Sequence, residues 1–147
     1  MQLSRRPSGL RYRLAALSAL AVLTGCNSFL DTVTAVRGKV SYHGVPLQTG
    51  TIVFTPDEQR GTAGPLARAE IRADGTYELG SDATPIPPAG WYRVTIVAME
   101  AWTGNDAAGG YSVPRSLLPD KYRDPELSGL SCEFKAGEDN ILNFDLD

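Results

Sequence analysis

Apolar and polar side chains alternate along short stretches of this chain from residue 35 to residue 147, and this alternation constrains the fold most. A period of two predicts β-strands, because successive side chains of a strand point to opposite faces. Residues 91–99 form the most apolar of these stretches. They place on one face Tyr92, Val94, Ile96 and Ala98. We therefore expect residues 91–99 to form a central strand of the core.

The same alternation occurs at 36–42, 51–55, 67–72, 76–79, 130–135 and 140–146. Turn residues separate these stretches: Asp74-Gly75 favours a tight turn, and residues 137–139 join the last two strands. No stretch of residues 35–147 keeps a helical period. The pattern predicts an all-β fold, an antiparallel β-sandwich of about seven strands with Ig-like architecture. We expect one domain at residues 35–147.

Residues 1–25 have a composition typical of a targeting segment. Their charges are all positive and come from Arg5, Arg6, Arg11 and Arg13. An apolar run follows at 14–23; it is about ten residues long, whereas a membrane-spanning helix needs roughly 20. The segment is therefore predicted to be a cleaved signal peptide. The general secretory route is favoured, and the pair Arg5-Arg6 leaves the twin-arginine route as the alternative.

The targeting segment ends in Leu23-Thr24-Gly25-Cys26, which has the pattern of a lipobox. We expect cleavage after Gly25 and acylation of the Cys26 thiol, so that two acyl chains hold the protein on a membrane. Residues 26–34 would then be a lipidated tether. The alternative is an ordinary secretory signal that leaves a free cysteine. Asn27, where an aspartate would favour the inner membrane, favours the outer membrane (periplasmic face or surface) within the cell envelope.

Loss of residues 1–25 changes the charge balance of the chain. Four arginines leave with them, so that the 14 basic residues become 10 against 17 acidic ones, a net charge of −7. An acidic surface repels phosphate backbones, and we expect no nucleic-acid partner. With Cys26 acylated, Cys132 is left without a disulfide partner. Because Cys132 alternates in phase with Leu130 and Phe134, we expect a buried small hydrophobe rather than a reactive thiol.

Several motifs of the chain resemble a known family. The sequence has GKV at 38–40, GVPL at 44–47 and GTIVF at 50–54, which resemble the opening of carboxypeptidase regulatory-like (transthyretin-like) domains. Its middle is similar in DGTYEL at 74–79 and PAGWYRV at 88–94. The runs LPDKY at 118–122 and DPELSGL at 124–130 resemble the close of small lipoproteins abundant in planctomycete bacteria. The resemblance covers about residues 35–147 and implies a seven-stranded, prealbumin-like sandwich.

Two enzyme types share the fold that this resemblance implies, and neither matches the residues. Intradiol dioxygenases hold iron through two tyrosines and two histidines, whereas this chain has one histidine, His43. Hydroxyisourate hydrolases need several histidines and the C-terminal sequence YRGS, whereas this chain has NFDLD at 143–147. His43 stands beside Gly44 and is expected in a solvated turn. We therefore predict a protein that is not an enzyme and has no cofactor.

Acidic side chains gather near the end of the chain. Glu138 and Asp139 are adjacent in a predicted turn, and Asp145 and Asp147 share an outward strand face. We interpret them as solvated charges and predict no metal site. A loose calcium site at one end of the sandwich is the alternative, since calcium binds clustered oxygen ligands.

The long loop predicted at 101–129 is the strongest candidate for binding, because binding residues concentrate on loops held by a rigid scaffold. Its candidate binding residues are Trp102, Tyr111, Arg115, Lys121, Tyr122 and Arg123. Aromatic rings beside cations suit a protein interface or a sugar ring. The alternative is that Trp102 and Tyr122 pack down on an edge of the sandwich.

Two functions follow as hypotheses. The first is a lipid-anchored, non-catalytic envelope protein whose sandwich binds a protein partner or organises the surface. The second is a carbohydrate-binding module for an envelope polysaccharide or peptidoglycan.

Overall fold

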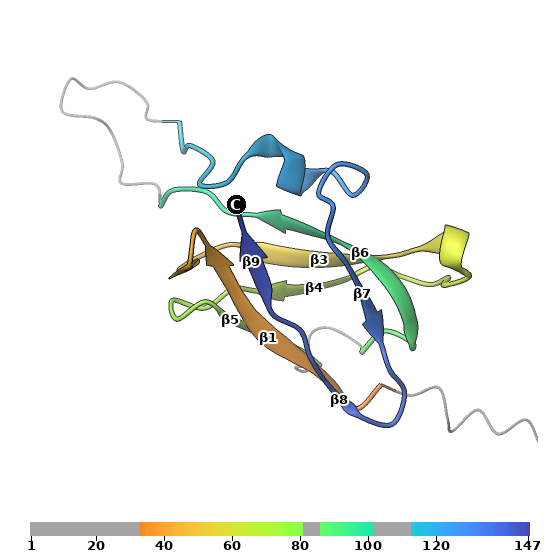
Figure 1. The fold of residues 1–147 in the computed structure, drawn as a ribbon. Helices are drawn as coiled ribbons and strands as arrows, with labels where there is room; N and C mark the ends of the chain where they lie inside the picture. Colours follow the sequence, from red (N-terminus) through yellow and green to blue (C-terminus); the bar gives the residue numbers. More distant parts are fainter. Residues whose placement is uncertain (1–32, 81–85, 102–112) are drawn as a thin grey trace, which may run out of the picture.

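The structure is a computed structural model that describes residues 33–80, 86–101 and 113–147. It consists of two β-sheets, of five and four strands, packed around one core (Figure 1). The other regular elements described are two short 3-10 helices, η2 (Glu58–Arg60) and η3 (Asp120–Arg123). The predicted all-β class is confirmed. Among the described residues, neither helix has the length and hydrophobicity that crossing a membrane requires.

The five-stranded sheet is built around β1 (Ala35–Tyr42). On one side β1 pairs antiparallel with β5 (Thr76–Leu79) and with the short β2 (Val45–Pro46). On the other side it pairs with β8 (Asp139–Ile141) and β9 (Phe144–Leu146), and both of these run parallel to it. The central strand of this sheet therefore comes from the beginning of the domain and one of its edges from the end.

The four-stranded sheet is antiparallel throughout. Its order is β4 (Ala67–Glu70), β3 (Thr51–Pro56), β6 (Gly90–Val97) and β7 (Ser131–Phe134). β6 lies between β3 and β7, so the central strand predicted at 91–99 is present, although it ends at Val97. Its inward residues Tyr92, Val94 and Ile96 are completely buried.

The core between the sheets contains a set of aromatic rings. Phe54 of β3 lies 5.9 Å from Tyr77 of β5 and 6.5 Å from Phe144 of β9, measured between ring centroids. Tyr92 of β6 stacks on Phe134 of β7 at 4.3 Å. Contacts between rings of both sheets join the sheets into one packed unit. Val33 belongs to the predicted tether, but it is 1% exposed and packs in the core.

The prediction of an antiparallel sandwich was wrong for β8 and β9. The single strand expected at 140–146 is divided at Leu142 and Asn143, and both halves run parallel to β1. The side chain of Asn143 accepts the Lys39 N–H at 3.0 Å, and the Leu142 carbonyl accepts the Tyr77 hydroxyl at 2.7 Å. These groups satisfy backbone atoms at the division, which is why the ladder can be interrupted there.

Gly38 of β1 lies opposite this division. A Cβ atom on Gly38 would stand 1.7 Å from the Leu142 carbonyl oxygen, so only glycine lets the two backbones approach this closely. The turn expected after β1 is also present: His43 is exposed, with φ of 51°, and Gly44 has φ of 75°. Two positive φ values in succession are typical of the tight turns that join hairpin strands.

Candidate functional site

The segment 113–130 runs along the edge of the four-stranded sheet, beyond the end of β7. The Arg115 carbonyl accepts the Glu100 N–H at 2.8 Å, and the Leu117 N–H donates to the Ala98 carbonyl at 2.9 Å. The Leu130 carbonyl accepts the Val94 N–H at 2.9 Å. The segment thereby covers the part of β6 that β7 leaves unpaired, and η3 lies within it (Figure 1).

Tyr122 of η3 fixes this segment to the other sheet. Its side chain is buried, and its hydroxyl lies 2.8 Å from the backbone oxygen and 2.9 Å from Oδ1 of Asp147, just after β9. The hydrogen bond from Tyr122, followed by that from Lys121, lowers the pKa of the Asp147 carboxyl. Tyr122 therefore packs down on an edge of the domain, which was the alternative to a binding role for this residue. Its ring is not available for stacking on a ligand.

The cations predicted in the loop lie at the surface. Arg115, Lys121 and Arg123 are exposed. Lys121 lies 3.3 Å from Asp147 Oδ1, and Arg123 lies 3.6 Å from Asp120. A guanidinium nitrogen of Arg123 is also 3.2 Å from Met99 Sδ. The three cations thus lie at the surface of one segment, and Arg123 contacts the side chain of Met99.

The remaining predicted site residues lie outside the described residues. These are Leu23, Thr24, Gly25 and Cys26 of the lipobox, and Trp102 and Tyr111 of the loop. Their roles stay predictions.

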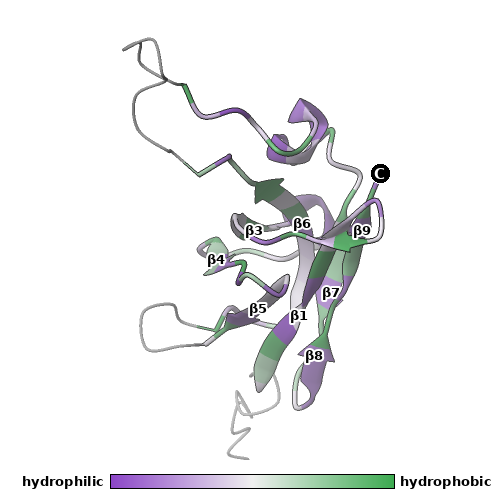
Figure 2. Ribbon diagram, turned by 90° about the vertical axis from the view of Figure 1, so that its left-hand side faces the viewer, coloured by the Kyte–Doolittle hydropathy of each residue, from purple (hydrophilic) through white to green (hydrophobic). Residues whose placement is uncertain are grey.

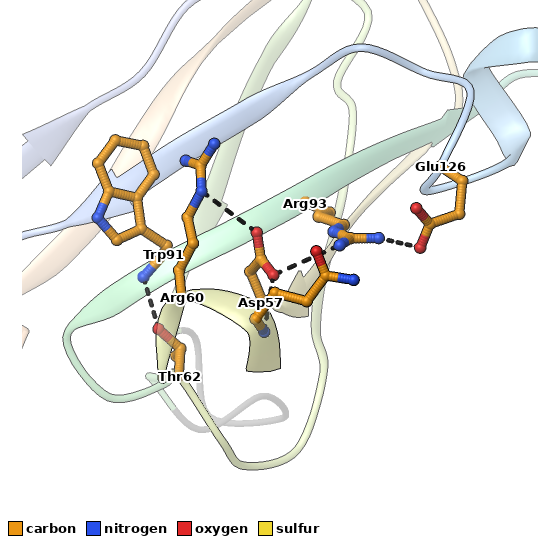
Figure 3. Close-up of polar contacts among 7 residues, drawn as sticks. Asp57, Arg60, Thr62, Trp91, Arg93 and Glu126 are labelled. Atoms are coloured by element: carbon orange, nitrogen blue, oxygen red, sulfur yellow. Dashed lines mark hydrogen bonds and ion pairs between the residues drawn. The ribbon is translucent and has the colours of Figure 1, made fainter.

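A second polar cluster on the outer face of the four-stranded sheet was not predicted. Arg93 of β6 lies between two carboxylates: it forms ion pairs with Asp57, at 3.5 Å, and with Glu126 (Figure 3). Asp57 is 6% exposed and also accepts the Gln59 N–H at 3.1 Å. The network joins the loop before η2 to the turn at 124–127 across the middle of the sheet.

The network continues to Trp91. Arg60 pairs with Asp57 at 3.5 Å and places its guanidinium 4.4 Å from the centre of the Trp91 ring. The backbone N–H of Trp91 donates to Thr62 Oγ1 at 2.7 Å (Figure 3). Beside these residues is an open surface hollow of about 290 Å³, between η2 and the 125–126 turn. Ion pairs from Asp57 to Arg60 and Arg93, and from Arg93 to Glu126, connect three segments of the chain, and we call this arrangement the clasp.

The sequence did contain a signal for this clasp. Arg93 is a charged residue within the most apolar stretch of the domain, and a charge that is largely buried needs partners. The alternation placed Arg93 on the outward face but could not name Asp57 and Glu126, which are 36 and 33 residues away.

Three of the four carboxylates considered for calcium, those of Asp139, Asp145 and Asp147, are engaged in other contacts. Asp139 forms an ion pair with Arg37 at 2.9 Å, and Asp145 accepts the Ser41 hydroxyl at 2.7 Å. Among residues 33–80, 86–101 and 113–147, no three His, Cys, Asp or Glu side chains gather in a group that could hold a metal ion.

Cys132 lies in the core, as predicted. It is 7% exposed, and burial raises the pKa of its thiol to about 12. Such a thiol remains protonated at neutral pH and does not act as a nucleophile.

Comparisons of the chain with protein-family models, with curated proteins and with solved structures give no match. Function must therefore be argued from the residues themselves.

Proposed function

We propose that this protein is a lipid-anchored protein of the cell envelope whose non-catalytic β-sandwich, of the carboxypeptidase regulatory-like type, binds a protein partner. The observation that carries the proposal is the run Leu23-Thr24-Gly25-Cys26 after a basic and apolar segment. The motif supplies a thiol for acylation directly beside small residues that admit a peptidase. The outer membrane is the favoured location, on the basis of Asn27.

The path of β1 supports a surface that remains accessible when the anchor is in a membrane. Ala35, at the beginning of β1, lies beside Asn140. The side-chain Nδ2 of Asn140 donates to the backbone carbonyl of Ala35 at 3.4 Å. Tyr42, at the other end, pairs with Leu146 next to the Tyr122–Asp147 contact. The beginning of β1 at Ala35 and η3 are thus at opposite ends of β1 (Figure 1). An anchored domain can therefore present η3 and the segment around it to a partner.

A protein partner is favoured over a glycan by the position of Tyr122. Sugar binding on this loop requires exposed rings for stacking, and the Tyr122 ring is in the core. The carbohydrate hypothesis then depends on Trp102 and Tyr111 alone.

The anchor is tested by the substitution Cys26→Ala. We expect the protein to move from the membrane fraction to the soluble fraction, because the acceptor thiol for the lipid is removed. Cys132→Ala is the matched control, since it removes a thiol from the core and leaves the lipobox intact. Unchanged membrane fractionation of Cys26→Ala would refute the lipobox.

The partner is tested by amine-reactive cross-linking in intact cells with the anchor in place. One dominant protein adduct is expected. If only glycan is recovered, the carbohydrate hypothesis replaces this one, and direct sugar-binding assays follow.

A further inference from the structure

Two loops without a charged side chain lie side by side at one end of the domain. The first comprises residues 61–66, before β4, and the second residues 86–89, before β6. A Cβ atom on Gly64 would stand 3.7 Å from a side-chain carbon of Pro88, so the two loops are in contact. They form one uncharged surface, in a chain of which 21% of the residues are charged.

The apolar side chains of these loops face the solvent. Leu66 is 58% and Ile86 36% exposed, and Ala63, Pro65 and Pro88 are exposed as well. We call these five residues the proximal surface. Exposed apolar side chains that gather without charges among them typically mark a place of contact with a partner or a membrane.

The proximal surface lies at the end where the chain enters β1. A tight turn joins β4 to its neighbour β5, so Leu66, just before β4, and Gly80, just after β5, are at the same end. A Cβ atom on Gly80 would stand 2.8 Å from Cγ1 of Ile86, which shows that Ile86 packs on Gly80. The preceding residue, Leu79, pairs with Val36 of β1. Figure 2 shows β8 and the beginning of β1 together at this end.

The predicted tether limits how far this end can be from a membrane. Val33, which is buried, is the seventh residue after Cys26. A chain extends at most about 3.5 Å per residue, so an acylated Cys26 would keep Val33 within about 25 Å of the lipid. A short tether gives an effective concentration on the order of millimolar, so a small apolar surface is enough for contact.

The charges of the domain also favour this end for contact with lipids. The mature chain has a net charge of −7, which anionic lipids repel, whereas the proximal surface has no charge. The turn at 135–139, at the same end, is nearly balanced. Lys135 and Glu138 have opposite charges, and Asp139 is paired with Arg37 at 2.9 Å.

We propose that the proximal surface rests on the bilayer that holds the Cys26 anchor, with the side chains of Leu66 and Ile86 at the boundary between head groups and acyl chains. This inference rests on the lipid anchor of the proposed function, and it adds the orientation of the domain. The domain then stands with β1 directed away from the membrane, and η3 is at its far end.

The experiment measures contact with lipid at single positions of the acylated protein, in vesicles of phosphatidylethanolamine and phosphatidylglycerol. A nitrobenzoxadiazole probe is attached to Leu66→Cys, to Ile86→Cys or to the control Val45→Cys. Val45 is 63% exposed and pairs with Tyr42 at the other end of β1. Nitroxide-labelled phospholipids should quench the probe at the two proximal positions about threefold or more above the control. The chain without an added cysteine corrects for any labelling of the buried Cys132.

A double variant tests whether the apolar side chains cause the contact. With the probe on Ala63→Cys, Leu66→Ser with Ile86→Ser should lower quenching about threefold or more, because the interfacial burial is lost. Val45→Ser with Leu127→Ser is the matched control, since it removes two exposed apolar side chains elsewhere, and quenching should not change. An unchanged thermal midpoint shows that the double variant is folded.

The outcomes separate this inference from the proposed function. Co-flotation with the vesicles is measured in the same samples, and a protein that lacks the lipid or does not float would refute the anchor. Flotation with equal quenching at Leu66, Ile86 and Val45 would overturn the orientation while the anchor stands. A probe at Leu66 whose emission shifts to shorter wavelength without quenching would also overturn it, because a second copy of the chain would then cover the surface.

Discussion

At the scale of single residues, polar side chains complete the backbone hydrogen bonding where strands are interrupted. Asn140 is the clearest case. It is 5% exposed; its Oδ1 accepts the Lys135 N–H at 2.8 Å, and its Nδ2 donates to the carbonyls of Lys135 at 3.0 Å and Glu138 at 3.1 Å. One side chain thus holds the turn that carries the chain from β7 in one sheet to β8 in the other.

The substitution Asn140→Ala is expected to lower the free energy of unfolding by about 2–3 kcal/mol, because it leaves several buried backbone groups without partners. Asn143→Ala is the matched control: its exposed side chain accepts one hydrogen bond, and its loss should be under about 1 kcal/mol. Urea unfolding of both variants measures the difference. Equal losses would mean that the Asn140 contacts do not hold the turn.

At the scale of elements, η3 is a short helix whose position depends on a contact with the other sheet. The Tyr122 hydroxyl provides that contact at Asp147, and Lys121 adds a charge beside it. The hydrogen bonds at Arg115 and Leu117 then align the rest of the segment along β6. The loop predicted from sequence is therefore, in its described part, an ordered edge of the sheet.

Tyr122→Phe should cost about 1 kcal/mol and should speed hydrogen exchange of the Leu117 amide about fivefold or more, because the segment loses its link to β9. Tyr92→Phe is the matched control. It also removes one hydroxyl bond, to the Pro88 carbonyl at 2.7 Å, but at a place far along β6 from Leu117. Local acceleration at Leu117 in both variants would contradict the role given to Tyr122.

The register of β6 is tested by a pair of neighbouring residues. Ile96 is completely buried and Val97 is 37% exposed. Ile96→Ala is expected to cost roughly 2–5 kcal/mol through lost burial and a cavity, and Val97→Ala less than about 1 kcal/mol. Chemical denaturation of the two variants measures both values. A loss under about 0.5 kcal/mol for Ile96→Ala would show that the register is wrong.

At the scale of the whole molecule, ionisable groups from both sheets are buried in one core. Burial raises the pKa of the Cys132 thiol to about 12 and of the Tyr92 phenol to about 12, and it also raises the pKa of Tyr77. These groups remain neutral in the folded protein at pH values where the unfolded chain has lost their protons. Folding is therefore linked to pH on the alkaline side.

Folding raises these pKa values. The free energy of unfolding therefore has its full value below the ordinary pKa values of 9.0 for cysteine and 10.0 for tyrosine. It is lost as the pH rises toward about 12. The free energy of unfolding should fall by about 1.4 kcal/mol per pH unit for each group that titrates only in the unfolded chain. Urea unfolding between pH 8 and pH 11 measures this slope. In Cys132→Ala the decrease between pH 9 and pH 10 should be smaller, and an identical slope would contradict the assignment.

Several features could be predicted from the residues because they depend on local patterns. Alternation identified β6 and its buried face, and it placed Cys132 and Phe134 in the core. The pair Asp74-Gly75 marked a turn, which the structure has with φ of 83° at Gly75. The parallel pairing of β8 and β9 could not be predicted, because the alternation within a strand is the same whichever direction its neighbour runs.

Some features of the candidate site could likewise be predicted from local sequence patterns, and others could not. The strand faces, the turns and the cations of the 113–123 segment could be predicted, since they depend on residues close together in the chain. The alternation could not show that Tyr122 is buried against Asp147, that Arg93 is held by Asp57 and Glu126, or that Met99 is opposed to Ser116. The physical reason is distance along the chain: each of these arrangements depends on residues that meet only when the two sheets and their connecting segments pack together.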